Sequence, residues 1–478
     1  MSSNMPVLDV YTIRDFRGGI TDEASRGVRG SFKFGYGLDV HGEENTLKCN
    51  QKLKKDSGTI VTDLILAWVP ATDGNLYGFG DTGKIYERTA AGVWSVVYTD
   101  PDGKILGAAE YEHKDGSATY RANLVWATQT KLKRIYIAGD WATDVVTIGT
   151  FAEGVAGDWH TMRMAVGVLM ICDGHYIAML DYEGAFNNKA LDIIPGNVTS
   201  CLLDMNNQVI IGSIERAKSK QGWLWTWDKI EPSWITKKPV GEKGVNTMSF
   251  IEMGILIQAG INGVLKYWDL VNLVPIKTIS GGGYVNPGGT TEFKGLPHFG
   301  INGSEKCGIY SYGRTDKNDV YSLNLEYIPS HGKLSGIEIG ALTVYDANLF
   351  VSWKDGTTYG VDTIDSANKA NGIYEGLEFN AGRPFEDKLF RFIKITTKPL
   401  PAECSVVVKY KMNKTADWIL TKMGDGAESL VGTGKTKGIW QIEGQGEVYE
   451  VRLELNSSGN DCPEITSINT YFEGLNIW

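Results

Sequence analysis

Short apolar runs separated by glycine-containing turns fill most of this chain. Within many runs apolar and polar residues alternate, which is the pattern of a β-strand with one buried face. Val168–Cys172 and Tyr176–Leu180 are two such runs, and Asp173-Gly174 stands between them. An Asp-Gly step between apolar runs is a strong signal of a β-hairpin. The pattern therefore predicts antiparallel strands joined by tight turns.

The strands recur at a regular spacing. Asp228 follows the run Gly222–Trp227 and gives the pair Trp227-Asp228. A second Trp-Asp pair, Trp268-Asp269, follows 41 positions later. That spacing suits one four-stranded propeller blade of about 40–45 residues. Cutting residues 65–380 at this period gives seven units, each with an apolar strand, a turn and an aromatic strand. We predict a β-propeller of about seven blades, with six or eight blades, a long β-sandwich or a β-helix array as alternatives.

The two ends of the chain differ from this repeat. Residues 1–64 show little periodicity and predict an extended N-terminal arm that closes the propeller, either as a surface loop system or as an arm that reaches a neighbouring subunit. We place the propeller at 65–382. Residues 383–478 contain five alternating runs, which predict a C-terminal β-sandwich. These runs are Phe390–Thr397, Cys404–Tyr410, Ile439–Ile442, Val448–Leu455 and Ile465–Tyr471.

Composition narrows the classes of function. The 478 residues are 42% hydrophobic and 22% charged, as in ordinary globular proteins, and the net charge is −10. An acidic chain gains little from phosphate backbones, which disfavours nucleic-acid binding. No apolar run approaches 18 residues, so no membrane span is expected, and the first six residues lack the features of a secretory signal. The six cysteines are expected to be reduced and mostly buried, with a Cys404–Cys462 pair left open.

No pattern of catalytic or metal-binding residues emerges. Gly432–Thr436 resembles the end of a phosphate-binding loop, but Ser429 stands where that loop needs glycine, and a glycine-rich hairpin loop is expected instead. The six histidines have no metal-ligand spacing. Asp173, Asp181 and Glu183 are expected to form turns, although a two-carboxylate sugar hydrolase has no short signature and stays an alternative. We predict no enzyme activity, no cofactor and no metal.

One strand is unusually aromatic. Trp223, Trp225 and Trp227 lie at every second position and so share one face of their strand. If that face is open to solvent, the three are candidate contacts for a partner or a glycan. The favoured alternative is that they fill space between blades.

Short phrases along the chain resemble structural proteins of tailed bacteriophages. Asp15-Phe16-Arg17-Gly18-Gly19-Ile20 is similar to the "aspartate, aromatic, any residue, Gly-Gly" phrase that opens many tail proteins. Leu38-Asp39 and the later Leu47-Lys48 are similar to a second phrase of these proteins. The segments Lys394–Pro401 and Val406–Lys411 look like the sandwich that follows such propellers. In architecture the chain most resembles the tail nozzle, or tail tubular protein B, of short-tailed phages.

This resemblance implies a function in assembly. It implies a structural subunit of the virion tail, made in the host cytoplasm, that forms a homo-oligomeric ring, with six copies favoured. The ring would contact an adaptor and fibres and would form or close the channel through which the genome leaves. An acidic lumen lets DNA pass without specific binding. The alternative is a receptor- or glycan-binding propeller of a phage tail.

Overall fold

The computed structural model describes residues 8–23, 27–43, 45–114, 119–155, 158–205, 207–215, 221–252 and 254–474. Every helix or strand assigned in this part of the chain is a β-strand, which confirms the all-β class. None of the described residues belongs to a helix that could span a membrane. The chain divides into two compact units: Met1–Leu53, Ile309–Ile328 and Ile364–Trp478 form the first, and Lys54–Gly308 and Pro329–Thr363 form the second.

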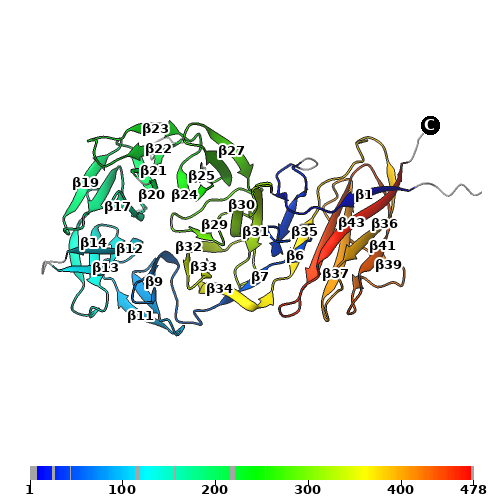
Figure 1. Ribbon diagram of the computed structural model, residues 1–478, viewed down its shortest axis with the longest axis horizontal. Coiled ribbons are helices and arrows are strands. Elements are labelled where there is room, and N and C mark those ends of the chain that lie inside the picture. Colours follow the sequence, from blue (N-terminus) through cyan, green and yellow to red (C-terminus); the bar gives the residue numbers. More distant parts are fainter. Residues whose placement is uncertain are drawn as a thin grey trace, which may run out of the picture. The chain divides into compact units, whose positions relative to one another are not determined.

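The second unit is a β-propeller, with its blades arranged around a central axis (Figure 1). Five antiparallel sheets contain four strands each, in sequence order. They are β8 to β11 (Ile65–Pro70, Leu76–Gly80, Lys84–Arg88, Trp94–Thr99), β12 to β15 (Ile105–Lys114, Tyr120–Thr128, Lys131–Tyr136, Val146–Thr150), β16 to β19 (Met162–Ala165, Val168–Asp173, Tyr176–Leu180, Phe186–Asp192), β20 to β23 (Asn197–Met205, Gln208–Glu215, Gly222–Trp227, Thr236–Pro239) and β24 to β27 (Val245–Ile251, Gly254–Ala259, Val264–Trp268, Leu273–Thr278). A sixth sheet of four strands combines β32 to β34 (Glu338–Tyr345, Asn348–Asp355, Thr358–Lys369) with β7 (Gln51–Lys55), which comes from the N-terminal segment. The remaining blade starts with β28 and β29 (Thr290–Phe293, Leu296–Ile301) and continues into β30 and β31 (Gly308–Gly313, Ser322–Tyr327).

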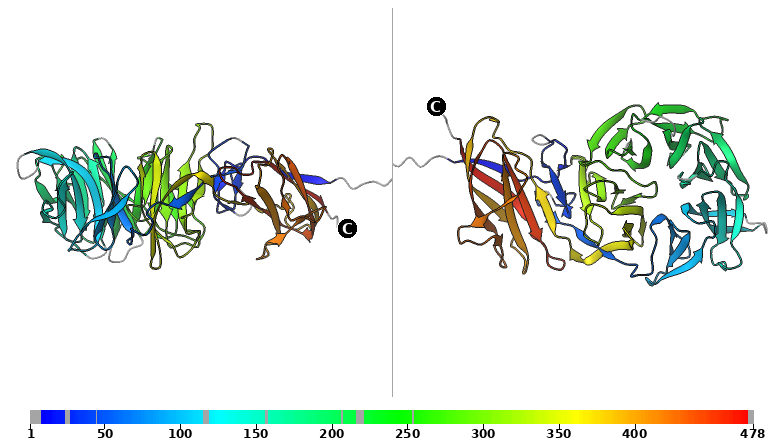
Figure 2. Two further views of the ribbon diagram at one scale, coloured as in Figure 1. Left: turned by 90° about the horizontal axis from the view of Figure 1, so that it is seen from below. Right: turned by 180° about the vertical axis from the view of Figure 1, so that it is seen from behind.

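The first strands of the seven sheets form the inner ring of the propeller. β8, β12, β16, β20, β24, β28 and β32 contact one another in that order, and β32 contacts β8 again. The indole N–H of Trp68 in β8 donates to the carbonyl of Ala341 in β32 at 2.9 Å, which ties the last blade to the first. The predicted seven-bladed propeller is confirmed, and Figure 2 also shows it edge-on.

The sequence pattern located the middle strands of the blades but missed the inner ones. Middle strands such as β17 and β25 are buried at every position, because the neighbouring blades cover both of their faces. Inner strands such as β20 and β24 mix small polar residues with apolar ones and lack clean alternation. The predicted hairpin at Asp173-Gly174 is confirmed, and Gly174 adopts the positive φ angle of 58° that its turn requires. Gly263, in the turn between β25 and β26, has a similar φ angle of 67°.

The first unit holds the C-terminal sandwich, and all five of its predicted strands are confirmed. One sheet has the order β1, β43, β36, β41, β39, and the other contains β31, β4, β35, β42, β37 and β38 in that order. β40 pairs with β37, and β30 neighbours β31. The bounds of these strands are Asp9–Ile13 (β1), Phe34–Tyr36 (β4), Gly308–Gly313 (β30), Ser322–Tyr327 (β31), Gly372–Glu375 (β35), Lys388–Thr397 (β36), Ser405–Met412 (β37), Ile419–Leu420 (β38), Lys422–Met423 (β39), Ser429–Leu430 (β40), Lys437–Gly446 (β41), Tyr449–Asn456 (β42) and Ile465–Gly474 (β43). Phe390 and Tyr449 stack between the sheets with ring centroids 4.8 Å apart.

The N-terminal segment differs from the expected arm. It supplies β1 and β4 to the sandwich, and it forms two short sheets of its own, β2 with β3 (Gly19–Ile20, Ser31–Phe32) and β5 with β6 (Leu38–Asp39, Lys48–Cys49). Its last strand, β7 (Gln51–Lys55), lies next to β34 as the fourth strand of the last blade, so the expected closure of the propeller by this segment is found. Phe16 and Phe32 are buried and contact the ring of Tyr374. Long-range strand pairing therefore joins residues 9–49 to the C-terminal strands, and the boundaries at 64 and 382 do not coincide with those of the two units.

Candidate functional site

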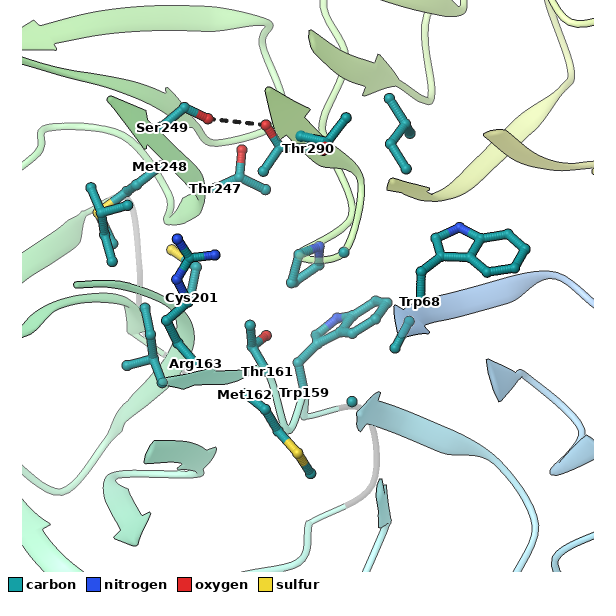
Figure 3. A pocket seen from close by; sticks show the side chains of 18 of the residues that line it. Trp68, Trp159, Thr161, Met162, Arg163, Cys201, Thr247, Met248, Ser249 and Thr290 are labelled. Atoms are coloured by element: carbon teal, nitrogen blue, oxygen red, sulfur yellow. Dashed lines mark hydrogen bonds between the residues drawn. The ribbon is translucent and has the colours of Figure 1, made fainter. Parts of the chain in front are cut away.

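A cavity of about 260 Å³ lies on the propeller axis, and all seven inner strands line it (Figure 3). Trp68, Trp159 and Arg163 are among its side chains, and Glu292 stands on its β28 side. Arg163 and Glu292 are exposed and Trp159 is half-buried. The ammonium group of Lys104 lies 5.8 Å from the centroid of the Trp159 ring. The cavity thus offers the remaining aromatic surface of Trp159 and a guanidinium group to a small ligand.

The hydroxyl groups around the cavity are bonded to the frame of the propeller. Thr161 donates to the carbonyl of Ser200 at 2.7 Å. The hydroxyls of Ser249 and Thr290 are 3.1 Å apart and link two inner strands, as the dashed line in Figure 3 shows. These hydrogen bonds hold neighbouring inner strands together. Because the hydroxyl groups are used in this way, few polar groups of the cavity wall converge on a ligand.

Backbone irregularities shape this cavity, and the sequence pattern did not reveal them. Five inner strands, β8, β12, β20, β24 and β32, carry a β-bulge where they pair with the second strand of their blade. A bulge bends its strand and re-aims the side chains. A side chain at Gly107, in the β12 bulge, would collide with the carbonyl of His160. The residues inserted at the bulges range from Leu66 and Leu106 to Ser200, so no common residue type in the sequence marks them.

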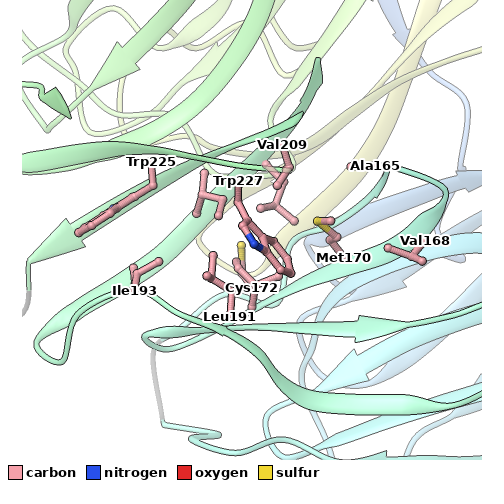
Figure 4. Packing of buried hydrophobic residues seen from close by; sticks show 12 residues of the cluster. Ala165, Val168, Met170, Cys172, Leu191, Ile193, Val209, Trp225 and Trp227 are labelled. Atoms are coloured by element: carbon pink, nitrogen blue, oxygen red, sulfur yellow. The ribbon is translucent and has the colours of Figure 1, made fainter. Parts of the chain in front are cut away.

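The tryptophans of β22 mostly fill space between blades. Trp225 and Trp227 are 0% and 3% exposed and pack in a cluster with Met170, Cys172 and other residues of the preceding blade (Figure 4). Their indole N–H groups donate to the hydroxyl of Ser213 at 2.9 Å and to the carbonyl of Glu231 at 2.8 Å. Burial removes these two as candidate contacts for a partner or glycan.

Trp223, the third candidate on this strand, is half-buried, and it packs against the same cluster. The ammonium group of Lys237 lies 3.7 Å from its ring centroid. The open part of this ring is therefore already covered by a cation, which leaves little free aromatic surface for a ligand.

Exposed apolar side chains recur at equivalent turns of the propeller. Among the five blades whose four strands are consecutive in the sequence, the turn between the third and fourth strands carries an exposed apolar residue in four, with exposures of 62%, 57%, 86% and 71% for Val93, Tyr182, Ile230 and Val271. Because strands alternate in direction within a blade, equivalent turns lie on the same face of a propeller. We call these four the outer-turn residues. The sequence pattern does not reveal them, because a single apolar residue in a turn has no period.

The two N-terminal phrases that resemble tail proteins are structural elements of the first unit. The carboxylate of Asp15 accepts the backbone N–H of Arg17 at 3.1 Å. Gly19 has a φ angle of 69°, and a side chain there would lie 2.6 Å from the carbonyl of Leu323. In the second phrase, Asp39 and Lys48 are direct partners across β5 and β6, and their side chains form an ion pair at 3.6 Å.

The carboxylates predicted to form turns have mixed roles. Asp181 accepts the N–H of Ala185 within its own turn, as predicted. Asp173 is fully buried and accepts the backbone N–H groups of residues 152–154 from the preceding blade. Glu183 bonds Lys114 at 2.9 Å and the hydroxyl of Tyr120 at 2.7 Å in the preceding blade. Two of the three therefore join blades and do not only shape turns.

The remaining candidates of the sequence occupy ordinary surroundings. Gly432–Thr436 is an exposed loop between β40 and β41, and no helix follows it. His160 is buried and bonded to the carbonyls of Cys172 and Gln129. Across the described ranges, no group of three histidine, cysteine, aspartate or glutamate side chains is arranged to hold a metal.

Comparisons with known proteins add little to this geometry. No family model matches the chain, and no curated protein matches it. Among solved structures, it is similar to the WD40 β-propeller domain of Doa1, with 13% identity over 66% of this chain and 97% of that one and a TM-score of 0.45. It is also similar to the designed protein Ika8, with 13% identity, coverage of 66% and 99% and a TM-score of 0.41. The propeller fold itself follows from the strand pairing described above.

Proposed function

We propose that this protein is a structural subunit of a bacteriophage tail, a nozzle or tail-tube component that assembles as a ring around the genome exit channel. The two phrases that resemble tail proteins carry this proposal, because both have structural roles in the first unit. In the first phrase, the carboxylate of Asp15 accepts a backbone N–H and the ring of Phe16 packs against Tyr374. In the second phrase, Asp39 and Lys48 stand opposite each other in two paired strands, β5 and β6. Residues with such roles are expected in a family that shares this scaffold.

The charge of the chain fits the same function. With a net charge of −10, a ring of several copies would be strongly acidic. An acidic channel wall repels the phosphates of DNA, so the genome could pass without being held.

The outer-turn residues are the surface that we assign to assembly. Exposed Val93, Tyr182, Ile230 and Val271 would leave water when a neighbouring subunit or another tail protein covers this face. Burial of apolar surface contributes roughly 25 cal/mol per Å². Four such side chains can stabilise a contact of modest area.

The test is electron microscopy and sedimentation of the full chain at high concentration, alone and with co-expressed proteins of the same tail. Rings or tail-bound particles are expected for the native chain. The variant Ile230→Ser with Val271→Ser should assemble less while its thermal unfolding stays unchanged. Ile261→Ser is the matched control, because Ile261 is 57% exposed and lies in the turn between the second and third strands, on the opposite face. A chain that stays monomeric and never joins a particle would contradict the proposal.

The axial cavity favours a second candidate, a receptor- or glycan-binding propeller of a phage tail. Trp159 can stack on a sugar ring, and Arg163 can bind a carboxylate or hydroxyl group of the sugar. A glycan array would discriminate the two functions. Binding that is lost in Trp159→Ala and retained in Trp223→Ala would favour this candidate, and no binding on the array would exclude it for the glycans tested.

A further inference from the structure

Two cysteines far apart in the sequence meet in the first unit. Cys49, in β6, and Cys462, just before β43, are 1% and 4% exposed. The backbone N–H of Cys49 donates to the sulfur of Cys462 at 3.4 Å. The pairing is fixed by the backbone, because Leu47 and Ile465 exchange both of their N–H···O bonds at 2.9 Å. Cys462 therefore pairs with Cys49, whereas the sequence had left open a pair with Cys404.

A cation stands beside this pair. The ammonium group of Lys369 donates to the sulfur of Cys462 at 3.5 Å. The backbone N–H of Lys369 donates to the carbonyl of Gly459 at 2.7 Å, which holds the lysine beside the loop that carries Cys462. The sulfur of Cys462 thus receives a backbone N–H and an ammonium group, as a thiolate does.

The two sulfurs differ in acidity. The hydrogen bond from the Cys49 thiol lowers the pKa of Cys462, the N–H of Cys49 and Lys369 act in the same direction, and burial opposes them. The same thiol–thiol bond, together with burial, raises the pKa of Cys49. Burial also raises the pKa of the propeller thiols Cys172 and Cys201. Cys462 is therefore the thiol best suited to react as a nucleophile.

We propose that Cys462 and Cys49 form a reactive thiol pair that a small peroxide oxidises to a disulfide. The Cys462 thiolate attacks one oxygen of hydrogen peroxide, the O–O bond breaks, and the leaving hydroxide takes a proton to become water. The thiol of Cys49 then attacks the sulfenic acid sulfur of Cys462 and releases a second water. Two thiols and one peroxide give one disulfide and two waters, so the two electrons lost by sulfur reduce the peroxide.

The disulfide would join residues 413 positions apart. It would link the N-terminal segment covalently to the C-terminal strands of the same unit. A bond that closes so long a loop removes conformational freedom from the unfolded chain. The oxidised first unit is expected to unfold at a higher temperature than the reduced one.

The test treats the reduced full chain with hydrogen peroxide, blocks the remaining thiols with an alkylating reagent after unfolding, and maps the peptides without reduction. A peptide linked through Cys49 and Cys462 is expected, with the other four cysteines alkylated. Cys49→Ser should accumulate a sulfenic acid at Cys462 that dimedone captures. Lys369→Met should slow the oxidation, and Cys404→Ser, the matched control, should leave it unchanged.

Three results would overturn the inference. The first is a folded native chain in which the Cys49–Cys462 peptide never forms. The second is oxidation of Cys172 or Cys201 at the same rate as Cys462, and the third is a disulfide between Cys404 and Cys462. All three are measured on the native chain alone, so they do not depend on whether a variant folds.

Discussion

Removing the carboxylate of Asp100 should strongly destabilise the propeller, because this buried group joins two blades. Asp100 follows the last strand of the first blade, and its side chain is fully buried. It accepts the indole N–H of Trp126 at 2.7 Å and the ammonium group of Lys133 at 2.6 Å, both from the second blade. Asp100→Ala leaves a buried ammonium group and a buried indole N–H without this partner.

The magnitude follows from these contacts. Removing one partner of a buried ion pair lowers the free energy of unfolding by about 3–5 kcal/mol, and leaving a buried N–H without an acceptor lowers it by about 1–3 kcal/mol. Burial acts to lower the pKa of Lys133, but the hydrogen bonds that its ammonium group donates to Asp100 and Asp102 outweigh burial and raise that pKa. Because Lys133 keeps its second partner, Asp102, at 2.5 Å, we expect the lower end of the range, about 3 kcal/mol.

Urea unfolding followed by tryptophan fluorescence, with hydrogen exchange to separate the two units, measures this loss. Asp102→Ala is the matched control. Asp102 lies nearby in the same turn but is 27% exposed, so its loss should cost about 1 kcal/mol or less. If Asp100→Ala costs no more than Asp102→Ala, the buried contact does not stabilise the propeller as argued. The double variant Asp100→Leu with Lys133→Met should recover much of the loss, because it leaves no buried charge unpaired.

Three further outcomes are expected. Gly107→Ala should lower the free energy of unfolding by about 1–3 kcal/mol, measured by urea unfolding, because the new methyl group meets a carbonyl in the segment leading into β16. Trp225→Ala should cost about 3–5 kcal/mol, whereas Trp223→Ala should cost clearly less, and equal losses would contradict the burial difference. The hydrogen bond from Lys398 lowers the pKa of Glu43 in the folded state. This pair therefore stabilises the first unit above pH 4.5, the ordinary pKa of a Glu side chain. The stabilisation is lost as the pH falls through the lower pKa of Glu43 in the folded state. When the unfolding temperature is measured against pH, Lys398→Met should show a smaller loss of stability on acidification than the native chain.

The candidate sites were less predictable than the fold. The period of two placed Trp223, Trp225 and Trp227 on one face, but it could not say which neighbour covers that face. The preceding blade buries Trp225 and Trp227, and Lys237 covers Trp223. The cavity on the axis had no sequence signal either, because each inner strand contributes only a few residues to it.

The sequence by itself determined the local structure of this protein. Alternation and Asp-Gly or Asn-Gly turns depend on residues close in the chain, so the hairpins, the blade period and the five sandwich strands could be predicted. The tertiary structure decided the rest. The pairing of β1 with β43, the ring closure of β8 by β32 and the meeting of Cys49 with Cys462 join residues hundreds of positions apart. No local pattern records such contacts, because they form only when the packed units bring distant strands together.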